Sequence, residues 1–150
     1  MKLATALSER ASIQKKITEL STRLNNNAKV QEGEKPAEDP QELMTELDNC
    51  LVRLEELISR INRTNNATKS GENTITDLIA KRDCLRERIR VLRDFLNVSS
   101  DRVSRYSKTE IKVHSTVSVA ELQKKVDSFS GELRALDEKI QELNWLTELL

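Results

Sequence analysis

The sequence predicts a mainly α-helical protein of four long antiparallel helices, packed as a bundle or coiled coil, with a possible short two-stranded β element at one end. Charged residues make up 33% of the 150 positions and aromatic residues only 3%, which is typical of helical bundles. Leucine, isoleucine and valine recur every three or four residues, a spacing that gathers them on one helix face. The length fits a single domain over residues 1–150.

The first predicted helix begins near Leu3 and fades at the three asparagines of positions 25–27. Its apolar stripe consists of Leu3, Ala6, Ile13, Ile17, Leu20 and Leu24. The next segment reads NAKVQEGEKPAEDP and contains one glycine and two prolines. A continuous helix is therefore excluded there, and we expect a polar loop.

The second predicted helix has a clear start, because Asp39 can cap it, Pro40 suits its first turn and Glu42 completes a capping-box pattern. Its stripe consists of Leu43, Leu47, Leu51, Leu54, Ile58 and Ile61. Gly71 then predicts a turn. The third helix should begin at Thr74, and its stripe consists of Ile75, Leu78, Leu85, Ile89, Leu92 and Leu96.

The fourth predicted helix carries the strongest pattern, a heptad that alternates steps of four and three residues. Its members are Val119, Leu122, Val126, Phe129, Leu133, Leu136, Ile140 and Leu143. Ser118 and Glu121 form a capping box ahead of it. If helical as far as Leu150, this segment is about 50 Å long and exceeds the other three helices.

The possible β element is placed in the two long connections, which should lie at the same end of the bundle. Ile111 and Val113, with β-branched neighbours, predict one short strand. Val30 in the first loop could supply the partner strand.

Composition also limits location and partners. The formal net charge is zero, so no overall field attracts nucleic acid or an anionic membrane. No apolar run approaches the ~20 residues of a membrane-spanning helix, and polar residues from Ser8 onward come too early for a signal peptide. We therefore expect a cytoplasmic protein without membrane contact, in which Cys50 and Cys84 are thiols.

The neutral total conceals two charged blocks. Residues 31–58 hold nine acidic against two basic side chains, whereas residues 81–108 hold nine basic against four acidic ones. We favour the interpretation that these consecutive helices pair with each other or across a dimer. The alternative is an anion-binding or nucleic-acid-binding stripe on the third helix. It has little support, since only Phe95 and Tyr106 could stack on bases.

No motif for catalysis, for a cofactor or for a metal is present. His114 is the only histidine and the two cysteines lie 34 positions apart, so neither a di-iron centre nor an ordinary zinc site is expected. The acids of the second helix, such as Glu55 and Glu56, are best interpreted as a solvated face. An enzyme is therefore the least favoured class of function.

One weak candidate for a ligand-binding site comes from polar residues that interrupt the apolar stripes toward one end of the bundle. These residues are Arg10, Asn62, Asn65, Arg82 and Asn144. A charge on a core stripe needs a partner, so the favoured interpretation is a structural arginine network that fixes register. The alternative is a polar pocket in which Arg10 and Arg82 bind an anionic small molecule or partner.

Several strings along the whole chain resemble a small bacterial family whose members are often labelled septicolysin. They are NAKVQEGEKPAEDP, INRTN, RYSKTEIK and NWLTELL. The label implies a secreted pore-forming toxin, whereas the residues themselves show neither an export signal nor a membrane-length segment. No functional residues carry over from the resemblance.

The resulting hypothesis is a non-enzymatic, cytoplasmic, homo-oligomeric protein with an interaction or structural role. Self-association is expected through the fourth helix, because its heptad is long and its end adds a wide apolar surface. That surface consists of Trp145, Leu146, Leu149 and Leu150.

Overall fold

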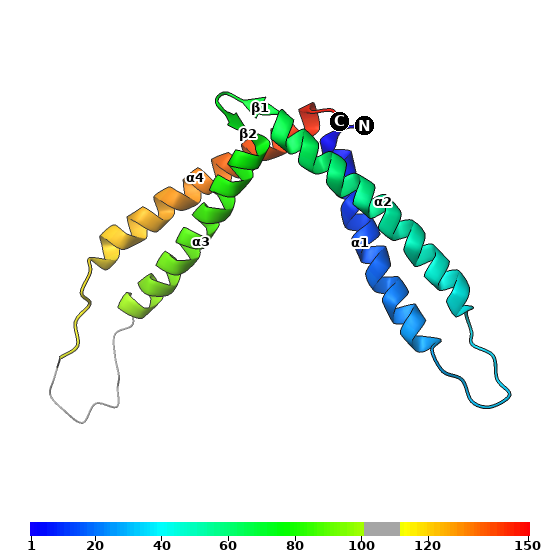
Figure 1. Cartoon of the computed structure of the whole chain (residues 1–150). Helices are drawn as coiled ribbons and strands as arrows, with labels where there is room; N and C mark the ends of the chain where they lie inside the picture. The colour runs from blue at the N-terminus through cyan, green and yellow to red at the C-terminus, as the bar shows by residue number, and fades with distance from the viewer. Residues whose placement is uncertain (101–111) are drawn as a thin grey trace. The chain divides into compact units, whose positions relative to one another are not determined.

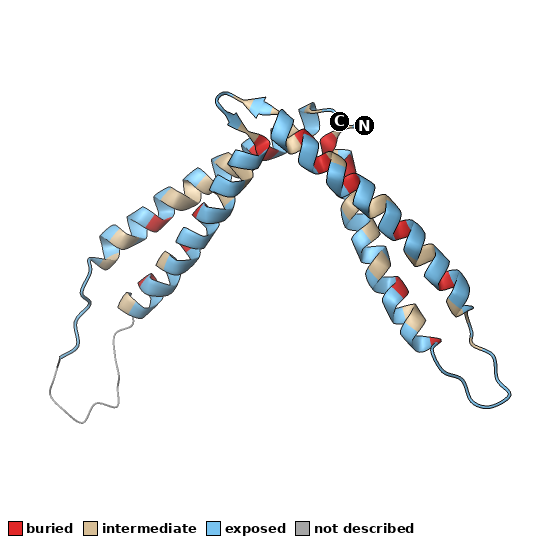
Figure 2. Ribbon diagram, viewed as in Figure 1, coloured by how far each residue is buried: buried red, intermediate tan, exposed pale blue. Residues whose placement is uncertain are grey.

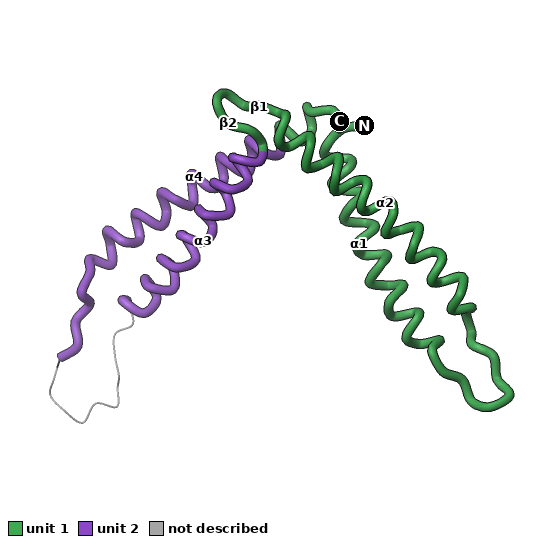
Figure 3. Tube along the Cα trace, viewed as in Figure 1, with its two compact units in different colours: residues 1–75, 142–150 green, residues 76–141 purple. Residues whose placement is uncertain are grey.

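The computed structural model describes residues 1–100 and 112–150, which form four helices and one two-stranded antiparallel sheet (Figure 1). The elements are α1 (Leu3–Asn26), α2 (Pro40–Ala67), β1 (Lys69–Ser70), β2 (Asn73–Thr74), α3 (Ile75–Ser100) and α4 (Val119–Leu146). The predicted mainly α-helical fold class is thus confirmed. Two compact units divide the chain (Figure 3). Unit 1 comprises residues 1–75 and 142–150, and unit 2 comprises residues 76–141.

The ends of α1 and α2 follow from local chemistry. The side chain of Asn27 closes α1, because its amide donates to the Arg23 carbonyl at 2.9 Å and its oxygen accepts the Glu38 N–H at 3.0 Å. At the start of α2, the Asp39 carboxylate accepts the Gln41 N–H at 2.8 Å and Pro40 fills the first position. The predicted cap of α2 is therefore confirmed.

The sheet exists but lies elsewhere than predicted. Its strands flank Gly71, with Lys69 opposite Thr74 and Ser70 opposite Asn73. Gly71 has a φ of +63°, a conformation that a tight turn requires and that glycine adopts without steric cost. Val30 is in no strand and neither is Val113, so the predicted pairing is wrong; Ile111 lies outside the described residues. Two-residue strands leave no alternating apolar pattern that a sequence could reveal.

Unit 1 has its core between the antiparallel helices α1 and α2. The buried members of α1 are Leu3, Ala6 and Leu20, and those of α2 are Leu43, Cys50, Leu57, Ile61 and Thr64 (Figure 2). The predicted stripe of α2 is therefore partly wrong. Cys50 and Leu57 face α1, whereas Leu51 and Ile58 are exposed. The buried positions of α2 follow a heptad on one helix face, because Leu43, Cys50, Leu57 and Thr64 stand seven residues apart.

Both ends of the chain belong to unit 1 and pair with each other. The Leu3 N–H donates to the Thr147 carbonyl at 2.9 Å, and the Leu149 N–H donates to the Met1 carbonyl at 2.8 Å. Because residues 147–149 adopt this extended pairing, α4 ends at Leu146 instead of Leu150. With 28 residues it equals α2 in length, so the prediction that it is the longest helix is wrong.

Unit 2 is built from the antiparallel helices α3 and α4. Leu85, Ile89 and Leu96 of α3 and Val126 and Ile140 of α4 are buried. The cap of α4 matches the prediction, since the Ser118 hydroxyl accepts the Glu121 N–H at 3.3 Å. The heptad positions of α4 from Val119 to Ile140 thus belong to unit 2, whereas Leu143 belongs to unit 1.

Candidate functional site

A row of residues on the outside of α2 combines apolar and acidic side chains. Its members are Met44, Asp48, Leu51, Glu55 and Ile58, which we call the α2 outer row. Steps of four and three residues place them on one helix face, about a third of a turn from the buried heptad. All five are exposed. Leu51, at 45% exposure, is as accessible as many polar residues although its isobutyl side chain gains from leaving water.

The α2 outer row includes a shallow groove. Leu51, Leu54, Glu55, Ile58 and Ser59 line it. All five come from α2, so the groove is a feature of one helix surface and not a closed pocket. Such a surface fits the side chains of another helix better than it fits a small molecule.

Ion pairs join α1 to the opposite side of α2 and to the loop just before α2. Arg53 donates from Nε and Nη2 to the Glu9 carboxylate at 2.7 and 3.0 Å. Nearer the loop, Lys16 lies 2.6 Å from Glu46, and Arg23 binds Glu38 through Nε. Hydrogen bonds from these cations hold the pKa values of the acids below their ordinary range. The carboxyl groups so affected are Glu9, Glu38 and Glu46.

Asp48 and Glu55 differ from these paired acids. Neither forms an ion pair with a basic side chain in the part of the chain that the structure describes. The negative charge of the α2 outer row is therefore not neutralised by the described residues of unit 1.

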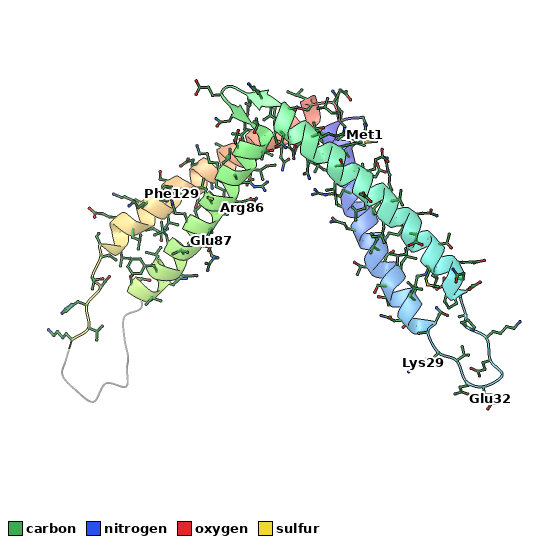
Figure 4. All side chains as sticks on the ribbon, viewed as in Figure 1. Met1, Lys29, Glu32, Arg86, Glu87 and Phe129 are labelled. Atoms are coloured by element: carbon green, nitrogen blue, oxygen red, sulfur yellow. The ribbon has the colours of Figure 1, made fainter. Side chains whose placement is uncertain are left out.

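The basic helix α3 is largely neutralised by neighbouring acids. Arg86 donates to Asp137 of α4 at 3.2 Å, and Arg90 binds Glu87 and Asp94 of its own helix. Figure 4 labels Arg86 and Glu87 on α3 and Phe129 on α4. Pairing of this kind leaves few cations free for a phosphate backbone, which weakens the nucleic-acid alternative.

A second row of exposed residues lies along a flank of α3 that borders α4. Its members are Lys81, Cys84, Arg88, Val91 and Phe95, which we call the α3 outer row, and all are exposed. The Arg88 guanidinium lies 5.1 Å from the centre of the Phe129 ring, and Lys81 lies 3.6 Å from Glu132. The row therefore presents two cations among apolar side chains, on the same three-and-four spacing as the α2 outer row.

Arg10 occupies a core-stripe position of α1, as predicted. Its Nε is buried and has no hydrogen-bond partner among the described residues. Its neighbour Glu9 is engaged by Arg53. Arg10 thus lies in unit 1, whereas Arg82 lies in unit 2.

Arg82 also occupies a core-stripe position, and it donates from Nε to the adjacent Asp83 at 2.9 Å. Its side chain is 23% exposed. A neighbour on the same turn therefore supplies the counter-charge.

The three predicted asparagines all belong to unit 1. Asn62 is exposed, whereas Asn65 and Asn144 are half-buried. The residue between the first two, Thr64, is fully buried and was missed by sequence reasoning. Its hydroxyl donates to the Arg60 carbonyl at 2.8 Å and accepts the Leu150 N–H at 3.0 Å. Its signal was the heptad register, in which residue 64 follows 57 and 61.

The apolar end of α4 is only partly covered. Leu149 is buried, whereas Trp145 and Leu146 are 64% and 65% exposed. Among residues 1–100 and 112–150, no helix is long and apolar enough to cross a bilayer. In the same described ranges, no three His, Cys, Asp or Glu side chains gather as a metal site would require.

Comparisons with known proteins place the chain in a family but leave its role open. No curated protein matches it. A crystal structure described as that of a functionally unknown conserved protein from Corynebacterium diphtheriae is similar, with 42% sequence identity and a TM-score of 0.94. The alignment covers 100% of this chain and 99% of the other. The model for the family of unknown function DUF6847 matches residues 10–149, and the septicolysin label gains no support. The chain therefore belongs to the family of unknown function DUF6847.

Proposed function

We propose that the protein is a non-enzymatic helical interaction protein that acts by self-association. The observation that carries this proposal is the α2 outer row, where Met44, Leu51 and Ile58 stand seven residues apart and are all exposed. A heptad of exposed apolar side chains is the pattern by which helices recognise other helices. Isolated exposed apolar residues need no explanation, but a regular row of them does.

One further feature supports self-association. Trp145 and Leu146 extend exposed apolar surface at the end of α4, and tryptophan is among the residues that most often anchor interfaces. Most of the α4 heptad belongs to unit 2, and we therefore propose this exposed end as the part of the fourth helix that takes part in self-association.

The mass in solution tests the proposal. Sedimentation equilibrium over a wide concentration range should give a mass that rises from 17.2 kDa toward a multiple of it. A constant mass of one chain at the highest concentration would contradict self-association.

A pair of variants tests the surface. Leu51→Ser combined with Ile58→Ser should weaken association at least about tenfold, since each removes roughly 1 kcal/mol or more of apolar burial. Val52→Ser is the matched control, because Val52 is 70% exposed on the same helix but lies off the row. Equal weakening by the control would show that general surface apolarity, and not the row, drives association.

A further inference from the structure

We propose that the α2 outer row of one copy docks on the α3 outer row of a second copy. This inference rests on the proposed self-association and names the two surfaces that meet. The partner of the acidic α2 outer row is thus the basic α3 outer row of another copy of this protein.

The spacing of the two rows is compatible. In the α2 outer row, Asp48 and Glu55 stand seven residues apart, with Leu51 between them. In the α3 outer row, Lys81 and Arg88 also stand seven residues apart, with Cys84 between them. Both helices therefore repeat charge and apolar contact at the interval of two helical turns, which is the condition for continuous side-by-side packing.

The charges select which rows can meet. Two copies of the α2 outer row would place Asp48 and Glu55 against the same acids, and two copies of the α3 outer row would place bases against bases. Like charges in contact disfavour a complex, whereas the acidic row against the basic row brings opposite charges together. The contact is therefore between two different surfaces, and each copy contributes one of each kind.

The present partners of the cations do not prevent this contact. Lys81 and Glu132 are 64% and 49% exposed in their side chains, and exposed ion pairs of this kind contribute little to stability. Arg88 keeps its contact with Phe129 through one face of the guanidinium, which leaves its N–H groups available for a carboxylate. Asp48 and Glu55 have no described basic partner to give up.

Charge-swap variants test the pairing. The first variant carries Asp48→Lys and Glu55→Lys, and the second carries Lys81→Glu and Arg88→Glu. Each alone should associate at least tenfold more weakly than the unchanged protein, because it opposes like charges. An equimolar mixture of the two should regain association, and so should one chain carrying all four changes. Salt should weaken the restored contact, since exposed charges are screened.

Matched controls change the same number of charges away from the rows. Glu32→Lys with Glu34→Lys alters the loop between α1 and α2, where Figure 4 shows Glu32 far along the loop, and Lys124→Glu with Lys125→Glu alters exposed positions of α4. Both controls should associate like the unchanged protein. Circular dichroism confirms that every variant keeps its helices.

The outcomes separate the two proposals. Loss of association in both swap variants without recovery in the mixture would overturn the pairing of the rows. Unchanged association in both would also overturn it, while self-association itself would stand. A third outcome is that the swaps change only the unfolding temperature of the 17.2 kDa single chain and leave association unchanged. That result would place the charge pairing within one chain and would also overturn the pairing of rows between copies. An unchanged protein that stays monomeric throughout contradicts the proposed function directly.

Discussion

Glu9 and Arg53 form a two-point hydrogen-bonded ion pair that joins α1 to α2, with N–O distances of 2.7 and 3.0 Å. A paired guanidinium and carboxylate fix orientation as well as distance, because the two N–H groups are parallel. Arg53 also binds Glu56 on its own helix at 2.7 Å. Arg53 therefore links α1 to α2 at the level of Glu9 and also binds an acid of its own helix.

The stability of unit 1 should fall in acid. Pairing lowers the pKa values of Glu9, Glu38 and Glu46 below the ordinary value of 4.5. A lowered folded-state pKa gives stability that is present above the unfolded value and is lost as pH falls through the folded one. Urea unfolding should therefore show a decline that begins near pH 4.5 and steepens below it.

Replacing all three acids by glutamine should lower the unfolding free energy at pH 7 and make its decline in acid shallower. Glu56, Glu87 and Glu148 also have lowered pKa values, so part of the decline remains. An equally steep acid limb in the triple variant would show that these pairs do not carry the effect.

Leu57→Ala and Leu51→Ala distinguish the core of α2 from its exposed row. Leu57 is fully buried, so its truncation should cost about 2–5 kcal/mol of unfolding free energy. Leu51 is exposed, and its truncation in the monomer should cost roughly 0.5 kcal/mol or less. Chemical denaturation at a protein concentration at which the chain is monomeric gives the unfolding free energies of the two variants. Similar costs at both positions would mean that α2 is rotated relative to the described core.

Helix ends could be predicted from the sequence because caps are local. Asp39 and Ser118 lie within a few residues of the backbone groups that they bind, so a short window contains the whole interaction. The outer face of α2 could not be predicted in the same way. A stripe through Leu51 and Ile58 has the same helical period as one through Cys50 and Leu57, and only packing against α1 decides between them.

The candidate site likewise contains residues that a local pattern predicts and residues that only tertiary contacts reveal. Arg10 was recognisable because it interrupts an apolar period, a feature of one segment. Thr64 was not recognisable, because its signal is the heptad register of the buried face, which is decided by packing against α1, and its partner Leu150 lies 86 positions away. The α2 outer row was likewise hidden, because its leucine and isoleucine were assigned to the core.

Thr64→Val should destabilise unit 1 although valine has nearly the same shape. The change removes the acceptor of the Leu150 N–H, and because this bond is only part-buried we expect a cost of about 1 kcal/mol. Thr64→Ser keeps the hydroxyl and should lose less. Thermal unfolding measures both, and a valine variant as stable as the original would show that water replaces the hydroxyl.

Arg82→Met should change stability by no more than roughly 0.5 kcal/mol, because its ion pair is with an exposed neighbour. Asp83 is 57% exposed in its side chain, and methionine keeps an apolar stem at this half-buried position. Arg82→Ala, which also removes the stem, should lose more. A large loss in the methionine variant would show that the guanidinium has a structural partner beyond Asp83.

Arg10→Met should stabilise the protein. The buried Nε of Arg10 has no partner in the described chain, and removing an unsatisfied buried donor while keeping the stem gains about 1 kcal/mol. Arg10→Lys distinguishes the effect of the Nε–H donor from that of the positive charge, because lysine lacks the Nε–H group but keeps a cationic side chain. If the buried Nε without a partner is the cause, both variants gain stability in chemical denaturation.

The anionic-pocket hypothesis predicts a different result. In that case inorganic phosphate raises the thermal midpoint of the unchanged protein and of the lysine variant, but not that of the methionine variant. A loss of stability in both variants, with no response to phosphate, would contradict both accounts and assign Arg10 a packing role through its stem.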